Sequence, residues 1–472
     1  MTYAHTYSGT RTREPSPREL EHGRLARRAA AGGIVLLKNT GTLPLDLSAP
    51  VALFGSGASR TVKGGIGSGD VNNRANVSIC QGLKDAGLRL TSENWLEDYE
   101  ARYHAARAAW KQKVLEAAHW VENPFDAYAA NPFVLPQGRP IVPQDVQGAA
   151  AAIYVLSRIA GEGKDRRLEK GDYYLSDGEW NDLRTLDRLG LPIVLLINAG
   201  GPVELTDLLD GAVHIEAVLQ LSQLGQEGGH AVADVLLGKA TPEGKLTATW
   251  ARRYTDYPCA ESFSYLDGDL EKAVYREGIY VGYRYFDSFG VQPLFPFGYG
   301  LSYTDFSLRF AGLRVGADAI EVDVEVENAG ICFSGREVAQ VYISCPQNGG
   351  AKELRRLAGF AKTRLLAPEQ RQTLTICIPQ KQLATFAAQK QGWVVEQGLY
   401  GVWVGNSSAA VTLCAQIRVD ADTVIEQTHP ICPLHQPLDE LGAADAAQKE
   451  AAHPAGLPVY GFCPRPEPRP EC

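Results

Sequence analysis

Short, mainly apolar runs of residues alternate with amphipathic segments through the first half of the chain. The runs have the length and composition of strands that are buried on both faces of a sheet. They cover residues 34–37, 51–54, 151–156, 191–197 and 214–219. The segments between them place apolar residues at helical spacing, as in Trp180, Leu183 and Leu186. Strands that alternate with helices predict an α/β fold, a layered sandwich with a mainly parallel sheet, over residues 18–255.

The hydrophobic period changes near residue 305. Residues 320–327, Ile-Glu-Val-Asp-Val-Glu-Val-Glu, alternate strictly between apolar and acidic side chains, which is typical of a strand with one buried face. Further strands are predicted at residues 338–343, 374–378, 399–404 and 411–419. Strands at this spacing predict an all-β sandwich over residues 305–420. We expect residues 256–304 to be a linker and residues 421–472, rich in proline and alanine, to be a tail or a second linker.

Composition narrows the possible partners. The 472 residues are 45% hydrophobic and 21% charged, which is ordinary for a soluble protein of two or three domains. A net charge of -9 argues against nucleic acid and anionic membrane as partners and suits a neutral or small substrate. The nine cysteines show no metal-ligand spacing, so no metal or other cofactor is predicted. Residues 1–17 lack the apolar core of a secretory signal, and we therefore expect a cytoplasmic protein.

Glu162 is the candidate for acid–base chemistry. It lies between Gly161 and Gly163, just beyond the apolar run 151–156, and a capping box from Ser176 to Glu179 opens the next helix. Open α/β sheets bind ligands at the carboxyl ends of their strands, and flanking glycines let the backbone approach a ligand closely. A carboxylate there can act as a general acid if its surroundings hold the proton near neutral pH. The alternative is a surface glutamate paired with Lys164 or Arg166.

A glycine-rich segment follows the run 51–54 and continues to Asp70. Its spacing does not fit a dinucleotide or phosphate loop, because position 60 is Arg60 and no GxxxxGK[ST] motif follows. The loop Lys63-Gly-Gly-Ile-Gly-Ser-Gly-Asp70 instead offers backbone N–H groups and the hydroxyl of Ser68, which suit an uncharged polyol. The alternative is that Ser68 is only a turn residue.

These segments together resemble glycoside hydrolase family 3. The resemblance extends over roughly residues 20–420, and its most specific passages are residues 275–287, YREGIYVGYRYFD, and 294–304, LFPFGYGLSYT. It implies the family's C-terminal α/β sandwich domain followed by a fibronectin type III-like module. It also implies that Glu162 is the general acid/base and that Gly67, Ser68 and Gly69 border the sugar.

The family's barrel domain is the part that the resemblance does not cover. Most members place a (β/α)8 barrel with the aspartate nucleophile first, and a permuted subgroup places it after the fibronectin-like module; we find neither barrel nor nucleophile motif in this chain. One hypothesis is that the chain is the acid/base half of a retaining β-glucosidase, acting on a β-glucoside or short oligosaccharide. It would be truncated, or completed by a barrel in cis or in trans, and inactive alone. The other is a non-catalytic carbohydrate-binding or scaffolding protein.

Two further groups allow more than one interpretation. Glu227 lies in a second glycine-flanked loop, but the start of a helix packed on glycines explains it adequately, so we rank it below Glu162 as the acid. Residues 123–143 are too long for a plain connection. The aromatic side chains Trp120, Phe125, Tyr128 and Phe133 could stack on a sugar, pin this segment to the domain, or form part of an apolar surface where a barrel docks.

Overall fold

The computed structural model describes residues 13–66, 69–159, 166–263, 266, 271, 274–348, 352–432, 438–442, 445–446 and 456–466. The chain divides into two compact units. The first, called the α/β unit, comprises Met1–Val203 and Leu208–Gly244. The second, called the β unit, comprises Glu204–Asp207 and Lys245–Cys472. Each unit is described by itself.

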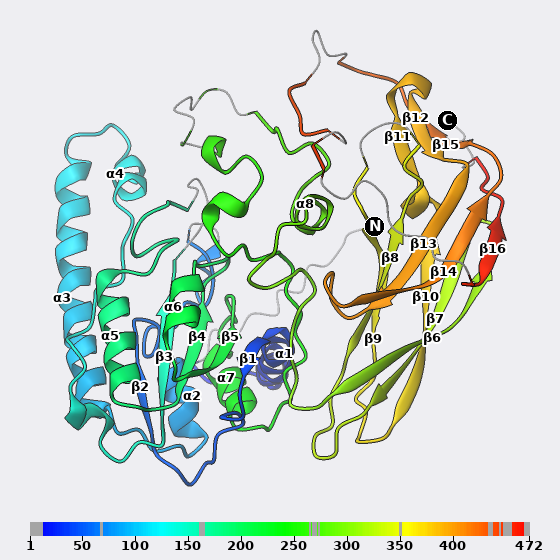
Figure 1. Cartoon of the computed structure of the whole chain (residues 1–472). Coiled ribbons are helices and arrows are strands. Elements are labelled where there is room, and N and C mark those ends of the chain that lie inside the picture. The colour runs from blue at the N-terminus through cyan, green and yellow to red at the C-terminus, as the bar shows by residue number, and fades with distance from the viewer. Residues whose placement is uncertain are drawn as a thin grey trace, which may run out of the picture. The chain divides into compact units, whose positions relative to one another are not determined.

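The α/β unit is built on one five-stranded sheet in the order β1-β5-β4-β3-β2 (Figure 1). β2 to β5 run parallel to their neighbours, whereas β1 pairs antiparallel with β5. Every residue of β2, β3 and β4 is buried, as expected for central strands covered on both faces. The α/β prediction with a mainly parallel sheet is confirmed. The strands are β1 (Val35–Asn39), β2 (Val51–Phe54), β3 (Ala151–Ser157), β4 (Ile193–Asn198) and β5 (Ile215–Gln220).

Helices connect and cover these strands. The predicted capping box at the start of α5 is present: the hydroxyl of Ser176 accepts from the backbone N–H of Glu179, and the Glu179 carboxylate accepts from the N–H of Ser176. α7 packs against both α1 and α2. The helices are α1 (Pro17–Gly33), α2 (Ile79–Asp85), α3 (Glu93–Ala118), α4 (Pro124–Ala130), α5 (Asp177–Arg188), α6 (Thr206–Gly211), α7 (Gly228–Leu236) and the 3₁₀ turn η2 (Pro143–Val146).

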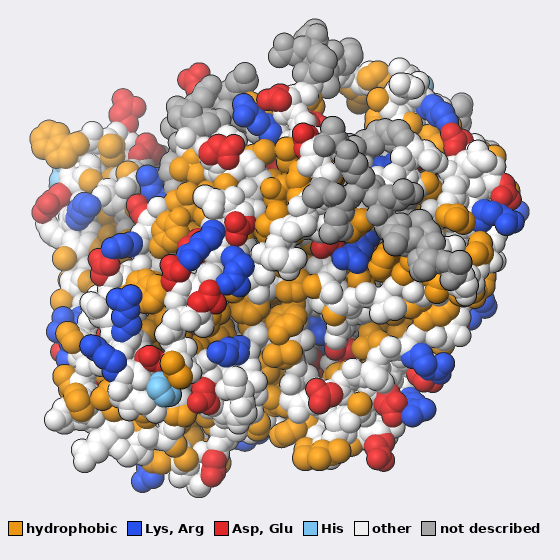
Figure 2. Space-filling model, in the orientation of Figure 1, with side chains coloured by type: hydrophobic (Ala, Val, Ile, Leu, Met, Phe, Trp, Pro, Cys, Tyr) orange, Lys and Arg blue, Asp and Glu red, His pale blue; other side chains and the backbone are white. Residues whose placement is uncertain are grey.

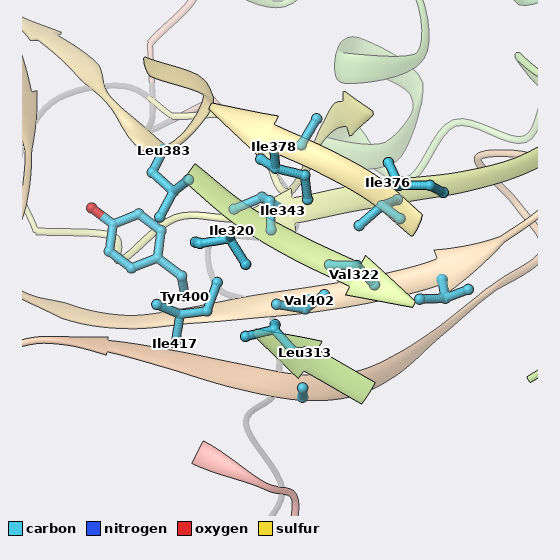
Figure 3. Close-up of a cluster of buried hydrophobic side chains, with 14 of the residues drawn as sticks. Leu313, Ile320, Val322, Ile343, Ile376, Ile378, Leu383, Tyr400, Val402 and Ile417 are labelled. Carbon is cyan, nitrogen blue, oxygen red and sulfur yellow. The ribbon is translucent and has the colours of Figure 1, made fainter. Parts of the chain in front are cut away.

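The β unit consists of mainly antiparallel sheets around an apolar core. A three-stranded sheet, β10-β7-β6, and a five-stranded sheet, β16-β14-β13-β8-β9, contribute most of the buried side chains labelled in Figure 3, among them Ile320, Ile343 and Ile417. A small sheet, β11-β12-β15, completes the unit. β7 (Ala319–Asn328) buries every second residue, which confirms the strand predicted from strict alternation.

The remaining strands of the β unit include several that the sequence analysis did not predict. They are β6 (Phe306–Val315), β8 (Val338–Ser344), β9 (Arg356–Lys362), β10 (Arg371–Pro379), β11 (Thr385–Ala387), β12 (Gly392–Val395), β13 (Gly398–Gly405), β14 (Val411–Val419), β15 (Thr423–Gln427) and β16 (Val459–Phe462). The last two fall in the segment 421–472 that was expected to be a tail or linker. β16 pairs parallel with β14, so a partner far away in the sequence orders this short stretch.

The segment 256–304, expected to be a linker, is folded where the structure describes it. It contains α8 (Tyr283–Phe289) and the 3₁₀ turn η4 (Ala260–Ser262). Its aromatic rings pack on one another: Tyr283 stacks on Phe297 at 4.8 Å between ring centroids, and Tyr285 stacks on Phe289 at 4.5 Å. This packing makes the segment part of the β unit rather than a free connection.

Candidate active site

Two glycines after β2 let the chain lie directly on β3. A Cβ at Gly55, whose φ is +94°, would sit 2.2 Å from the carbonyl oxygen of Val155. A Cβ at Gly57 would sit 2.0 Å from the hydroxyl oxygen of Ser157. Neither position leaves room for a side chain, so these glycines serve close packing between backbones. This packing carries the glycine-rich segment across the carboxyl end of β3.

Asn198, at the carboxyl end of β4, fixes the start of the predicted sugar loop. Its side chain is fully buried. Its carboxamide oxygen accepts from the N–H of Val62 at 2.7 Å, and its nitrogen donates to the carbonyl of Val62 at 2.9 Å. The same oxygen accepts from the hydroxyl of Ser157 at 3.2 Å. One buried amide therefore joins the ends of two strands to the residue before Lys63.

Lys63 closes the predicted sugar loop. Its ammonium donates to the carbonyl oxygen of Val71 and lies 3.5 Å from the carboxylate of Asp70. Gly69 is exposed, and its N–H donates to the carbonyl of Ile66 at 3.3 Å inside the loop. Gly67 and Ser68 lie outside the described residues, so their contact with a sugar remains a prediction.

Arg158 anchors the segment that leaves β3. It is 5% exposed, and every one of its side-chain nitrogens has an acceptor. Nη1 and Nη2 donate to the two carboxylate oxygens of Glu179 at 2.7 and 2.9 Å. The remaining bonds go to the carbonyl oxygens of Ser157, Asp172 and Tyr174. A paired and fully hydrogen-bonded arginine can be buried at tolerable cost, so it ties β3 to the start of α5.

Arg166 anchors the far end of the same segment. Its Nε donates to the carboxylate of Asp172 at 2.7 Å, and its Nη1 donates to the carbonyl of Pro202 at 2.6 Å. The guanidinium of Arg166 is thus engaged by Asp172 and Pro202, while its pairing with Glu162 remains an open alternative. Glu162 itself lies outside the described residues, and its role remains a prediction.

A cavity of about 440 Å³ opens between these anchors. Its wall includes Ile66, beside the predicted sugar loop, and Ile159 and Arg166, on either side of the segment that carries Glu162. The described flanks of both loops thus border one cavity of the α/β unit. Residues 132–138 form another part of the wall, and Trp95, Tyr154 and Asp182 line it as well.

Asp182 is one of the carboxyl groups that line this cavity, and the sequence analysis did not identify it. Burial, together with the negative charge of Glu179, raises its pKa to about 7 despite a hydrogen bond from Tyr154. The hydroxyl of Tyr154 donates to Asp182 at 3.1 Å, and Nε2 of Gln137 donates at 3.2 Å. A signal was present: Glu179 and Asp182 lie on the same helical face as the buried Leu183.

Glu227 is held by a neighbouring histidine. Its carboxylate lies 2.7 Å from Nδ1 of His230, whose Nε2 lies 2.9 Å from the carboxylate of Asp85. The three side chains clamp α2 to α7, which supports the structural interpretation of Glu227. His214 lies beside Asp187, with 3.1 Å between Nδ1 and the carboxylate, as expected for a structural histidine.

Metal and membrane features were sought in the described part of the chain. No three His, Cys, Asp or Glu side chains in it are arranged to hold a metal ion. None of the helices formed by the described residues is long and apolar enough to cross a bilayer. Figure 2 shows Lys and Arg side chains interspersed with Asp and Glu over the drawn face, without a continuous basic stripe.

Comparison with known proteins gives two domain matches and many relatives. Residues 34–283 match the "Glycosyl hydrolase family 3 C-terminal domain", and residues 337–408 match the "Fibronectin type III-like domain". A beta-glucosidase of Ruminococcus albus is 35% identical over 84% of this chain and 40% of its own length. Beta-glucosidase A of Butyrivibrio fibrisolvens is 32% identical over 95% of this chain and 57% of its own length.

Solved structures agree with these matches. Beta-glucosidase 3B from Thermotoga neapolitana, in complex with glucose, superposes with a TM-score of 0.76 and is 37% identical over 86% of this chain and 55% of its own. A beta-glucosidase from Paenibacillus barengoltzii superposes with a TM-score of 0.77 at 33% identity. The chain spans about half the length of the curated relatives it matches. Since one domain match alone covers residues 34–283 of 472, and the fibronectin-like match follows it, the chain belongs to glycoside hydrolase family 3.

Proposed function

We propose that this chain supplies the acid/base half of a retaining β-glucosidase, with Glu162 as the proton donor. The observation that carries the proposal is the shared cavity. The anchored ends of the segment around Glu162, at Ile159 and Arg166, and Ile66 beside the loop of Ser68 all border it. The beta-glucosidase relatives and the glucose complex of the Thermotoga neapolitana enzyme support a β-glucoside as substrate.

In the proposed reaction, Glu162 donates its proton to the glycosidic oxygen while a second carboxylate attacks the anomeric carbon. The bond to the leaving group breaks, and a covalent glycosyl-enzyme forms. Glu162 then takes a proton from water, whose oxygen attacks the anomeric carbon and releases the sugar with retained configuration. In retaining sites the two carboxyl groups stand about 5–5.5 Å apart. We propose that a (β/α)8 barrel, in cis or in trans, contributes the second one.

As the general acid, Glu162 must carry a proton near neutral pH in the completed site. The guanidinium of Arg166 donates to Asp172 and to the carbonyl of Pro202, so it already has acceptors of its own. Ser68, between Gly67 and Gly69, would bind the sugar through its hydroxyl and the adjacent backbone.

We expect the chain alone to hydrolyse glucosides no faster than background. A positioned general acid typically contributes about 10²–10⁴-fold, whereas enzymes reach about 10⁶–10¹⁷-fold over the uncatalysed reaction. The difference requires the nucleophile and the substrate contacts of the proposed barrel. The function is therefore a property of the completed site, of which this chain would be one part.

The test is hydrolysis of a chromogenic β-glucoside by the purified chain, alone and with the barrel domain of a permuted relative added in trans. Activity should appear only in the mixture and should fall by at least about 10²-fold in Glu162→Gln. Asp177→Asn is the matched control, because Asp177 is an exposed carboxylate near this segment that is not part of the cavity wall. Turnover by the chain alone would contradict the proposal that a separate barrel supplies the nucleophile. Unchanged activity of Glu162→Gln in the mixture would show that another group is the acid.

A further inference from the structure

The end of the α3–α4 hairpin carries three exposed aromatic side chains. Trp120, in the turn between the helices, is 89% exposed, and Phe125 and Tyr128 on α4 are 64% and 39% exposed. The rings of Phe125 and Tyr128 lie 5.9 Å apart between centroids and are tilted by 30°. Aromatic side chains normally bury most of their large surface, and an exposed cluster of them marks a binding surface. We call these three residues the aromatic tip.

Side chains of α3 and the cap of α4 hold part of the aromatic tip in place. Trp110 of α3 meets Tyr128 edge-on at 5.8 Å, and its indole N–H donates to the carbonyl of Asn131 at 2.6 Å. The guanidinium of Arg107 lies 4.1 Å above the Trp110 ring. Asn123 caps α4 by accepting from the N–H of Phe125 at 3.1 Å. These contacts already order the backbone of α4 and the supporting Trp110 ring. Binding of a ligand to the tip therefore costs little conformational entropy there.

The charged side chains around the aromatic tip limit the kinds of ligand that it can bind. Residues 119–131 contain the exposed carboxylates of Glu122 and Asp126 and neither lysine nor arginine. Nucleic acid and anionic lipid are disfavoured there, since both require cationic side chains. Flat rings beside carboxylate acceptors suit a neutral ligand with an apolar face and hydroxyl groups at its rim.

We propose that the aromatic tip is an auxiliary carbohydrate-binding platform, which stacks on the glucosyl rings of a β-glucan or β-gluco-oligosaccharide. The proposal rests on the proposed function for its sugar class, but it concerns a separate site. Trp110 also contacts Phe133 edge-on at 5.6 Å, and Phe133 lines the cavity of about 440 Å³. Trp110 thus contacts both a residue of the tip, Tyr128, and a residue of the cavity wall, Phe133.

The test is affinity electrophoresis of the full chain in native gels that contain a soluble β-glucan, with xylan gels as the comparison. The β-glucan should retard the wild-type chain. Trp120→Ala and the double variant Phe125→Ala/Tyr128→Ala should each bind about tenfold more weakly. Phe360→Ala is the matched control, because Phe360 of β9 is an aromatic side chain exposed to 66% outside the tip. Circular dichroism and sedimentation velocity of each variant check folding and self-association.

Each outcome bears on the proposal. Retardation that persists in Phe360→Ala but is lost in the tip variants supports it. Unretarded wild-type chain or equal losses in Phe360→Ala would overturn it. Tip variants that dissociate a dimer without changing retardation would also overturn it, because a second copy of the chain would then be the occupant. The hydrolysis test with an added barrel is independent, so either proposal can fail while the other stands.

Discussion

Arg158 and Arg166 donate to the same acceptor, the carbonyl oxygen of Asp172. The distances are 2.6 Å from Nε of Arg158 and 2.8 Å from Nη2 of Arg166. The chain between the two arginines therefore leaves from and returns to a common point beside the cavity. These two arginines, which flank the segment of the proposed acid Glu162, are themselves held by Glu179 and Pro202.

The first prediction concerns the anchor Arg158. Arg158→Met should lower the free energy of unfolding of the α/β unit by about 3–5 kcal/mol, because it leaves the carboxylate of Glu179 buried without its counter-charge. Urea unfolding followed by circular dichroism measures the loss. The control is Arg167→Met: Arg167 and Glu169 form an ion pair at 3.6 Å with both side chains about 60% exposed. That control should change stability by at most about 0.5 kcal/mol. Similar small losses in both variants would contradict the prediction.

A second prediction separates close packing from backbone strain in the glycine-rich segment. Gly55 and Gly87 have nearly the same φ, +94° and +91°. A Cβ at Gly55 meets the backbone of Val155 at 2.2 Å, whereas a Cβ at Gly87 meets nothing within 4 Å. Gly87→Ala should cost about 1–2 kcal/mol from strain alone. Gly55→Ala should cost at least about 2 kcal/mol more, measured by urea unfolding. Equal costs would show that the contact with β3 is not rigid.

The local pattern of apolar and polar residues was enough to predict strands whose residues are all buried or are buried in strict alternation. β3 and β4 appear in the sequence as continuous apolar runs, and β7 appears as an alternating one. The antiparallel direction of β1 had no such signal, because a buried strand reads the same in either direction. β16 is four residues long, and a partner distant in the sequence orders it, so no local period reveals it.

Sequence indicates the candidate residues that come directly after a predicted strand. It does not indicate contacts that form only when distant parts of the chain fold together. The glycine-flanked Glu162 follows β3, and this is visible in sequence. Asn198 ends β4 as a polar residue after an apolar run, which was a usable signal for the buried amide at the sheet edge. The contacts of Arg158 with three carbonyl oxygens depend on how the loop folds back, which no spacing encodes.

The third prediction concerns the pH dependence of the clamp at His230. Burial lowers the pKa of His230, but hydrogen bonds with Glu227 and Asp85 outweigh burial and raise it above its ordinary value of 6.5. A raised histidine pKa stabilises the fold fully below the unfolded pKa of about 6.5, and this contribution is lost as pH rises through the folded pKa. His230→Gln should therefore cost more stability at pH 5.5 than at pH 9 in urea unfolding. His22→Gln, at an exposed position of α1, should show no such difference. A cost for His230→Gln that does not depend on pH would contradict the claim that protonated His230 stabilises the fold by pairing with Glu227 and Asp85.

The last prediction concerns Asp182, whose pKa burial raises to about 7. The unfolded chain releases this proton near pH 3.9, whereas the folded chain keeps it to about pH 7, so the folded state binds more protons between these values. Stability should consequently fall as pH rises from about 4 to about 7. Asp182→Asn removes the ionisation and keeps an oxygen that accepts from Tyr154 and Gln137. The variant should exceed the wild type by about 1–3 kcal/mol in free energy of unfolding at pH 8, and the gain should vanish near pH 4. Asp177→Asn, at an exposed position of the same helix, should change stability by at most about 0.5 kcal/mol. A gain at Asp182 that is equal at pH 4 and pH 8 would show that the carboxyl is not held protonated by burial.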